Sequence, residues 1–145
     1  MNYWHMNLHP TGERGTNQDI RNRVLSHTIG MGIDFEPVQE NDFKNNMQIG
    51  DVVLVLNGRT PIALVQVIGD HYEYTIDHNS LVWYPARRAV KILGIIGDRN
   101  NGCFPTDENF VIARTNPGTL KRSTDTNCET YKYIDGLYKC CMENS

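Results

Sequence analysis

The chain has 145 residues, of which 39% are hydrophobic. A chain of this length buries about 70% of its unfolded surface on folding, which suits a single domain over residues 1–145 and makes a second domain unexpected. The net charge of −3 argues against binding to a polyanion through the overall charge of the chain.

Basic residues nevertheless fall into three groups along the chain. These are Arg14, Arg21 and Arg23 near the start, Arg87, Arg88 and Lys91 in the middle, and Lys121 and Arg122 near the end. Each group is either a solvated surface or a local patch that contacts phosphates.

The cysteine pattern and the first residues bear on the compartment. Cys103, Cys128, Cys140 and Cys141 form no C-x-x-C pair, and adjacent cysteines rarely share a disulfide, so we expect a reduced, cytoplasmic chain. The start, MNYWHMNLHP, has no basic segment followed by an apolar core, and no apolar run approaches about 18 residues. We therefore expect neither a signal peptide nor a membrane span.

The first third of the chain predicts a strand, a helix and a second strand. Residues 3–8 alternate bulky side chains and end at a proline, which is typical of a strand. Thr16 and Asp19 have capping-box spacing at the start of a helix whose apolar face would hold Ile20, Val24 and Leu25. In the following strand, TIGMGIDFEP, two glycines leave the backbone uncovered, which marks either close approach by a ligand or a bulge.

The middle of the chain predicts a β-hairpin. Asp42 is expected to cap a short helix that places Phe43 and Met47 one turn apart. The apolar strand 52–56 then meets the turn dipeptide Asn57-Gly58, and residues 62–68 return antiparallel. Further strands are expected at 72–76 and 89–96.

The last third gives a weaker signal. Residues 97–109 resemble a loop, and the final segment, TYKYIDGLYKCCMENS, is either a helix broken at Gly136 or a hairpin over Asp135-Gly136. Short strands around a core with helices at the gaps predict an α+β fold, a mixed β-barrel of about five to six strands with two to four flanking helices.

No motif in the sequence indicates an enzyme. The histidines are scattered without metal-ligand spacing, and no serine, cysteine or lysine lies in a recognised nucleophile motif. They are His5, His9, His27, His71 and His78. We therefore expect no catalytic residue, no bound metal and no cofactor.

The order of motifs over residues 1–96 resembles the EVE domains of the PUA-like superfamily, which are related to YTH and ASCH domains and are attached to modification-dependent restriction systems. The matching segments are Tyr3-Trp4, Ile29 to Asp34, Met47 to Val55, Gly69 to Tyr74 and Arg88 to Leu93. The resemblance implies a PUA-like barrel, with residues 97–145 as an unassigned extension of the same domain.

The resemblance also implies a function. EVE and YTH domains resemble each other in holding one modified base, flipped out of its strand, in an aromatic or apolar pocket. Flipping costs a few kcal/mol, and stacking on aromatic faces returns roughly 1–3 kcal/mol per base. The implied function is recognition of a methylated or hydroxymethylated cytosine, or of methyladenine, in DNA as the specificity element of a restriction or defence system.

Site residues follow from the same resemblance, position by position. The pocket walls would be Trp4, His5, Asn7, Gly32, Ile33, Asp34 and Phe35. Asp34 or Asn7 would bond an exocyclic amine, and Ile33 replaces an aromatic residue frequent in the family, which favours an apolar substituent such as a methyl group. The rim and the contacts to the strand backbone would be Tyr72, Tyr74, Tyr84, Arg87 and Arg88.

Simpler explanations exist for several of these residues. Trp4 is also expected for a core ring, and tyrosines at a period of two also pack a half-buried strand. Two alternative functions stand beside the first: an RNA-binding PUA-like module, and a small hydrolase or nuclease accessory domain. Expected partners are nucleic acid, with DNA ahead of RNA, and a nuclease or AAA+ motor protein.

Overall fold

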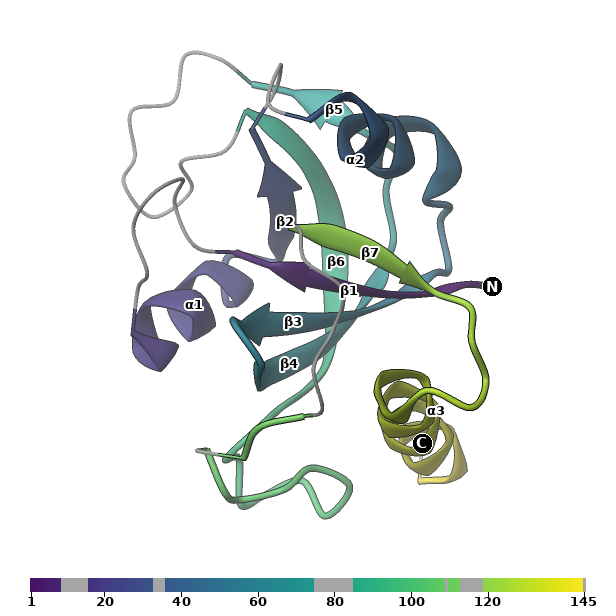
Figure 1. Ribbon diagram of the computed structural model, residues 1–145. Helices are drawn as coiled ribbons and strands as arrows, with labels where there is room; N and C mark the ends of the chain where they lie inside the picture. Colours follow the sequence, from purple (N-terminus) through teal and green to yellow (C-terminus); the bar gives the residue numbers. More distant parts are fainter. Residues whose placement is uncertain (9–15, 33–35, 75–84, 109, 113–118, 145) are drawn as a thin grey trace.

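The computed structural model describes residues 1–8, 16–32, 36–74, 85–108, 110–112 and 119–144 (Figure 1). Its helical segments are α1 (Asn17–Val24), α2 (Pro37–Asn41), the π-helical turn η1 (Asp42–Asn46) and α3 (Glu129–Glu143). Its strands are β1 (Tyr3–Asn7), β2 (Thr28–Met31), β3 (Val52–Asn57), β4 (Thr60–Val67), β5 (Tyr72–Glu73), β6 (Ala86–Ile95) and β7 (Leu120–Ser123).

The strands form one mixed sheet in the order β2-β6-β4-β3-β1-β7, with β5 also paired to β6. Neighbouring strands are antiparallel except β1 and β3, which are parallel. The sheet curls into a half-barrel, and the predicted α+β PUA-like fold is confirmed (Figure 1). The described residues contain seven strands, one more than the largest number expected.

Strand β3 explains why the molecule has two cores. Its sequence, VVLVLN, is buried at every position, so both of its faces are covered. Because side chains alternate along a strand, Val53 and Val55 join the inner core enclosed by the sheet, whereas Val52, Leu54 and Leu56 join an outer core on the opposite face.

The predicted hairpin is present, with its turn one residue later than expected. Asn57 pairs with Thr60, so the connecting residues are Gly58 and Arg59. Gly58 has a φ of +65°, a conformation that glycine adopts without a steric penalty. Asn7 holds the turn to β1 because its Oδ1 accepts a 2.7 Å hydrogen bond from the Gly58 amide.

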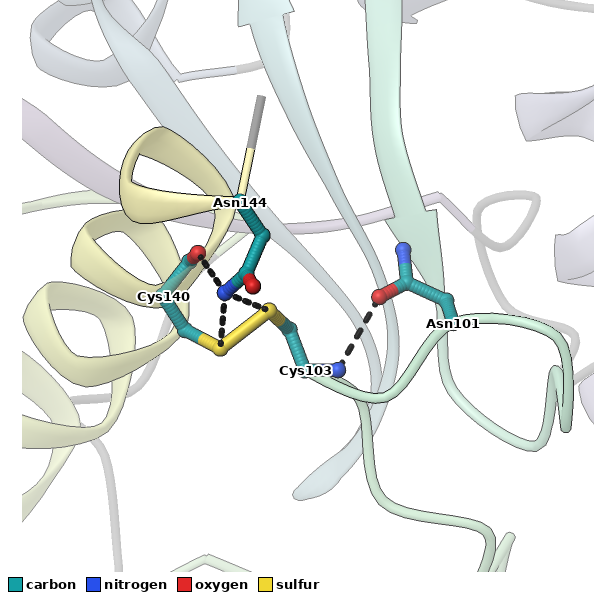
Figure 2. Close-up of a disulfide and its surroundings, with 4 residues drawn as sticks. All are labelled: Asn101, Cys103, Cys140 and Asn144. Carbon is teal, nitrogen blue, oxygen red and sulfur yellow. Dashed lines mark hydrogen bonds between the residues drawn. A yellow bond between two sulfur atoms is a disulfide. The ribbon is translucent and has the colours of Figure 1, made fainter.

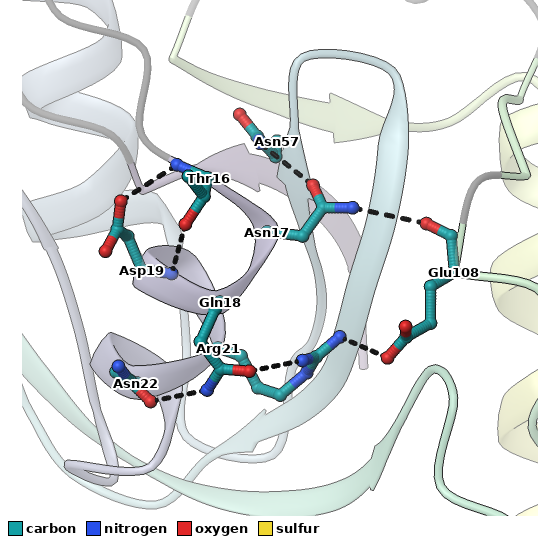
Figure 3. A network of polar contacts seen from close by, with 8 residues as sticks. All are labelled: Thr16, Asn17, Gln18, Asp19, Arg21, Asn22, Asn57 and Glu108. Carbon is teal, nitrogen blue, oxygen red and sulfur yellow. Dashed lines mark hydrogen bonds and ion pairs between the residues drawn. The ribbon is translucent and has the colours of Figure 1, made fainter.

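Helix α1 has the predicted capping box. The Thr16 hydroxyl accepts from the Asp19 amide at 3.1 Å, and the Asp19 carboxylate accepts from the Thr16 amide at 2.9 Å (Figure 3). The predicted apolar face is wrong at one position, because Leu25 is 51% exposed. Arg23 lies on the buried face with Ile20 and Val24.

Side chains from α1 also tie the helix to distant parts of the chain. Asn17 accepts from Asn57 of the hairpin at 2.9 Å and donates to the Glu108 carbonyl at 3.2 Å (Figure 3). Arg21 forms an ion pair of 2.7 Å with the Glu108 side chain.

The helical segment before β3 begins earlier than predicted. Glu36 caps α2 by accepting from the amides of Val38 and Gln39, and the chain continues from α2 into η1 without a break. Asp42 is therefore inside a continuous helical segment, and the prediction that it begins a helix is wrong. Phe43 and Met47 both lie in the inner core.

Several predicted strands differ in length or position from the observed ones. β2 ends at Met31, so Gly32 follows the strand, and β6 begins at Ala86, three residues before the expected start. β5 contains only two residues, and positions 75 and 76 of the strand predicted there lie outside the described residues.

The C-terminal segment is one helix, which decides between the two alternatives for it. α3 continues through Gly136 and packs Ile134 and Leu137 into the outer core. The ring of Tyr3, from the outer face of β1, lies 5.2 Å from Tyr131 and 6.0 Å from Tyr138, measured between ring centroids.

The expectation of a fully reduced chain is wrong. Cys103 and Cys140 form a disulfide with a Cα–Cα distance of 5.7 Å, which links the segment after β6 to α3 (Figure 2). The Asn144 amide lies 3.6 Å from each of the two sulfur atoms. Cys128 and Cys141 are free thiols, and burial raises the pKa of Cys141.

None of the helices in the described part of the chain is both long and apolar enough to cross a membrane.

Candidate nucleic-acid interface

Two exposed tyrosines mark the end of the sheet where β5 pairs with β6. Tyr72 is 43% exposed and Tyr74 is 48% exposed, and their spacing of two places both side chains on one face. Tyr72 is the register partner of Arg87, and the Arg87 guanidinium carbon lies 5.1 Å from the centroid of the Tyr74 ring. A buried cation therefore lies against an exposed aromatic ring, in an arrangement called here the tyrosine rim (Tyr72, Tyr74 and Arg87).

The neighbouring arginine has a different role from the one predicted. Arg88 is 3% exposed and points into the barrel. It donates hydrogen bonds of 2.8 to 3.1 Å to carbonyls of Phe43, Lys44, Met47 and Gly69. Since its donors are used in holding η1 to the sheet, the prediction that Arg88 contacts a nucleic-acid backbone is wrong.

Ion pairs between charged side chains near the tyrosine rim link β5 to η1. Lys44 of η1 lies 2.8 Å from Glu73 and 3.3 Å from Glu40. The hydrogen bond between Lys44 and Glu73 raises the pKa of Lys44 and lowers the pKa of Glu73. Burial lowers the pKa of His71, whose ring lies edge-on to Phe43. These contacts link the side chains of His71 and Glu73 to η1, next to Tyr72 in β5 and Tyr74 directly after it.

Trp4 occupies the core instead of a pocket wall. Its side chain is completely buried, and its indole Nε1 donates a 2.9 Å hydrogen bond to Asp51. Asp51 also accepts from the amides of Asn2 and Gln48, so the buried carboxylate is held by several donors. A base cannot stack on a ring that has no accessible face, and the prediction that Trp4 is a wall of an open pocket is wrong.

His5 and Asn7 lie on the opposite face of β1 from Trp4. Alternation along the strand directs Tyr3, His5 and Asn7 outward and Trp4 and Met6 inward. Burial, together with the nearby Lys121, lowers the pKa of His5 to about 4, and Asn7 is engaged with the hairpin turn. The structure therefore does not bring Trp4, His5 and Asn7 together on one surface.

The remaining predicted pocket residues are only partly described. Gly32 is half-buried directly after β2. Ile33, Asp34, Phe35 and Tyr84 lie outside the described residues.

Other predicted phosphate contacts are distributed over the surface. Arg122 lies over the Trp4 ring at 5.6 Å and donates to Asn2 at 2.7 Å, whereas Lys91 and Lys121 are exposed. In the described part of the chain, no group of three or more His, Cys, Asp or Glu side chains is placed to hold a metal ion.

Arg23 is a buried charge, like Asp51 and Arg88, and the sequence did not lead us to predict its burial. The signal was present, because Arg23 follows Ile20 by three positions and therefore falls on the apolar face of α1. Because Leu25 was assigned to the apolar face, the place of Arg23 on that face was not recognised.

The fold and the tyrosine rim describe an α+β protein with a PUA-like barrel and an exposed aromatic edge. The chain belongs to the family described as a domain of unknown function, DUF8426, whose model matches residues 4–105. No curated protein matches the sequence.

Three solved structures are similar in fold. Human THYN1, in complex with DNA that contains 5-methylcytosine, is 11% identical, with 97% of this chain and 98% of that chain covered and a TM-score of 0.49. A hypothetical protein from Leishmania major is 14% identical, with 100% and 98% covered and a TM-score of 0.49. Protein Atu2648 from Agrobacterium tumefaciens is 14% identical, with 94% and 93% covered and a TM-score of 0.47.

Proposed function

We propose that this chain is a non-catalytic module that binds nucleic acid and recognises a modified base in DNA, as its resemblance to EVE domains implies. The observation that carries the proposal is the tyrosine rim. Two tyrosines that are each more than two-fifths exposed offer stacking faces at the end of the sheet. Burying such rings against bases gains roughly 1–3 kcal/mol per stacked base.

The tyrosine rim also fits the charge of the chain. With a net charge of −3, attraction of a nucleic acid must come from a local feature. Arg87 supplies a positive charge directly behind the Tyr74 ring, where a cation–π contact holds the ring in place. Stacking with local charge support can bind a single displaced base without a broad basic surface.

The biological role follows from the resemblance and extends the proposal. A module of this kind would act as the specificity element of a restriction or defence system, beside a nuclease or an AAA+ motor protein. A base flipped from its strand is accessible on both faces and on its hydrogen-bonding edge, which is what a reader of base modification requires.

The test is a binding titration with matched oligonucleotides. Fluorescence anisotropy would compare DNA carrying 5-methylcytosine, 5-hydroxymethylcytosine or 6-methyladenine with unmodified DNA and with RNA of the same sequence. We expect preferential binding to one modified DNA. Equal or tighter binding to RNA would favour the RNA-binding alternative, and no binding to any oligonucleotide would remove the proposal.

A variant ties that binding to the tyrosine rim. Tyr74→Ala should weaken binding to the preferred oligonucleotide by roughly 1–3 kcal/mol while the melting temperature stays nearly unchanged, because the ring is exposed. Phe110→Ala is the matched control, since Phe110 is an aromatic residue of similar exposure (41%) that stacks on Tyr133 beside α3. Wild-type affinity in the Tyr74→Ala protein would exclude the tyrosine rim as the binding surface.

A further inference from the structure

Arg23 is a buried cation whose hydrogen bonding is incomplete. Its side chain is 7% exposed, on the face of α1 that enters the inner core. Nη1 donates a 3.0 Å hydrogen bond to the carbonyl of Leu8, the residue directly after β1. Nε is buried and has no hydrogen-bond partner.

No acidic side chain in the described part of the chain forms an ion pair with Arg23, although Asp19 lies near enough for the charge of Arg23 to contribute to the lowering of its pKa. None of the ion pairs formed there includes Arg23. Asp19, one helical turn earlier, directs its carboxylate to the Thr16 amide in the capping box. Burying a cation without a partner is costly, and an apolar residue at this position would complete the face formed by Ile20 and Val24.

The unused donors of the Arg23 guanidinium indicate which kind of group could bind there. The Leu8 carbonyl occupies Nη1, and the edge formed by Nε and Nη2 makes no hydrogen bond with the described residues. Two parallel N–H groups on one edge of a guanidinium match two oxygens of a phosphate or carboxylate.

We infer that Arg23 is a binding residue for an anionic group at the end of β1, which its Nε–Nη2 edge holds by charge-assisted hydrogen bonds. On the proposed function, on which this part of the inference rests, the anion is a phosphate of the bound strand. The cost of the incompletely paired charge in the free protein is then recovered when the ligand binds.

The first experiment tests the anion site without nucleic acid. Melting temperatures of wild-type protein and of Arg23→Met are compared in inorganic phosphate and in chloride at equal ionic strength. Methionine keeps an apolar stem and removes the charge, so in chloride the variant should melt at or above the wild-type temperature. Phosphate should stabilise the wild type more than Arg23→Met.

Arg21→Gln is the matched control on the same helix. Arg21 pairs with Glu108 at the surface, so this variant should respond to phosphate as the wild type does. If Arg23 only ties α1 to Leu8, Arg23→Met will melt below the wild type in chloride, and phosphate will shift both melting temperatures equally. That result would overturn the inference.

The second experiment measures binding of the preferred oligonucleotide as a function of salt. Arg23→Met should bind about tenfold or more weakly and lower the slope of log affinity against log salt by about one. Arg23→Lys should restore much of the slope because it keeps the charge, and Arg21→Gln should behave as the wild type.

The two experiments separate this inference from the proposed function. Unchanged affinity and slope in Arg23→Met, with no specific phosphate effect, would overturn the inference while the proposed function stands. If phosphate stabilises the protein through Arg23 but the protein binds no oligonucleotide, the anion site is supported. That result would overturn the statement that its anion is a phosphate of a nucleic acid.

Discussion

The two faces of β1 and β3 are both buried, but they are covered in different ways. The inner face is closed by the curled sheet itself, by α1 and by η1, and its apolar side chains are accompanied by the buried charges of Arg23, Asp51 and Arg88. The outer face is covered by α3 and by Ile96, Cys103, Phe104 and Ile112, which follow the end of β6. It contains tyrosines and His5 and is linked covalently by the Cys103–Cys140 disulfide.

The difference between the two faces indicates which changes should destabilise each of them. An apolar inner core loses stability mainly when volume is removed. Because the outer layer also holds the disulfide and His5, we expect it to respond to redox state and to pH as well. The hydroxyl of Tyr3 crosses from β1 to α3 to donate a 2.8 Å hydrogen bond to Asp135.

The largest effect is expected on the inner face, from Trp4→Ala. Removing a fully buried indole should lower the free energy of unfolding by roughly 3–5 kcal/mol, measured by urea denaturation. Tyr3→Phe, the adjacent outward-facing position, removes only one hydrogen bond and should cost about 1 kcal/mol. A stable Trp4→Ala protein with altered base binding would return Trp4 to the pocket and weaken the contrast between the faces.

The second prediction concerns the covalent link of the outer face. Cys103→Ser should lower the free energy of unfolding by about 2–4 kcal/mol, because the disulfide closes a loop between positions 37 residues apart. Hydrogen exchange should show loss of protection in α3 before β3 and β4. Cys128→Ser, at an exposed free thiol, should change neither quantity. Finding four titratable thiols in the native protein would contradict the cross-link.

The smallest of these effects is a pH dependence centred on His5. Its pKa falls from the ordinary value of 6.5 to about 4 on folding, so the unfolded chain takes up the proton first as the pH drops. Stability from this group is therefore complete above about pH 6.5 and is lost toward pH 4, with about 2 kcal/mol lost between pH 7.5 and 5.

Two variants separate the contribution of His5 to the pH dependence of stability from the contributions of other groups. His5→Gln should reduce the loss of stability between pH 7.5 and 5 relative to the wild type. His27→Asn, at an exposed position whose positive φ asparagine tolerates, should leave it unchanged. Identical pH profiles for wild type and His5→Gln would mean that His5 is not buried as the outer face requires.

Much of the fold could be predicted because local rules decided it. The spacing of Thr16 and Asp19 located the start of α1, and the run from Val52 to Leu56 with its glycine turn located the hairpin. Less of the site could be predicted. The role of Tyr72, Tyr74 and Arg87 as rim contacts stays a prediction, whereas Arg88 and Trp4 are internal.

The periodicities, the caps and the turns could be read from the sequence, because these features depend on residues only a few positions apart. The apolar run over the first five residues of β3 predicted a strand, and the structure then showed that both of its faces are covered. Only the tertiary structure decided that Arg88 would hold η1, that Arg23 would be buried with an unpaired Nε, and that Cys103 would meet Cys140. These outcomes depend on which distant segments become neighbours, and that is set by how the sheet curls and how both of its faces are covered.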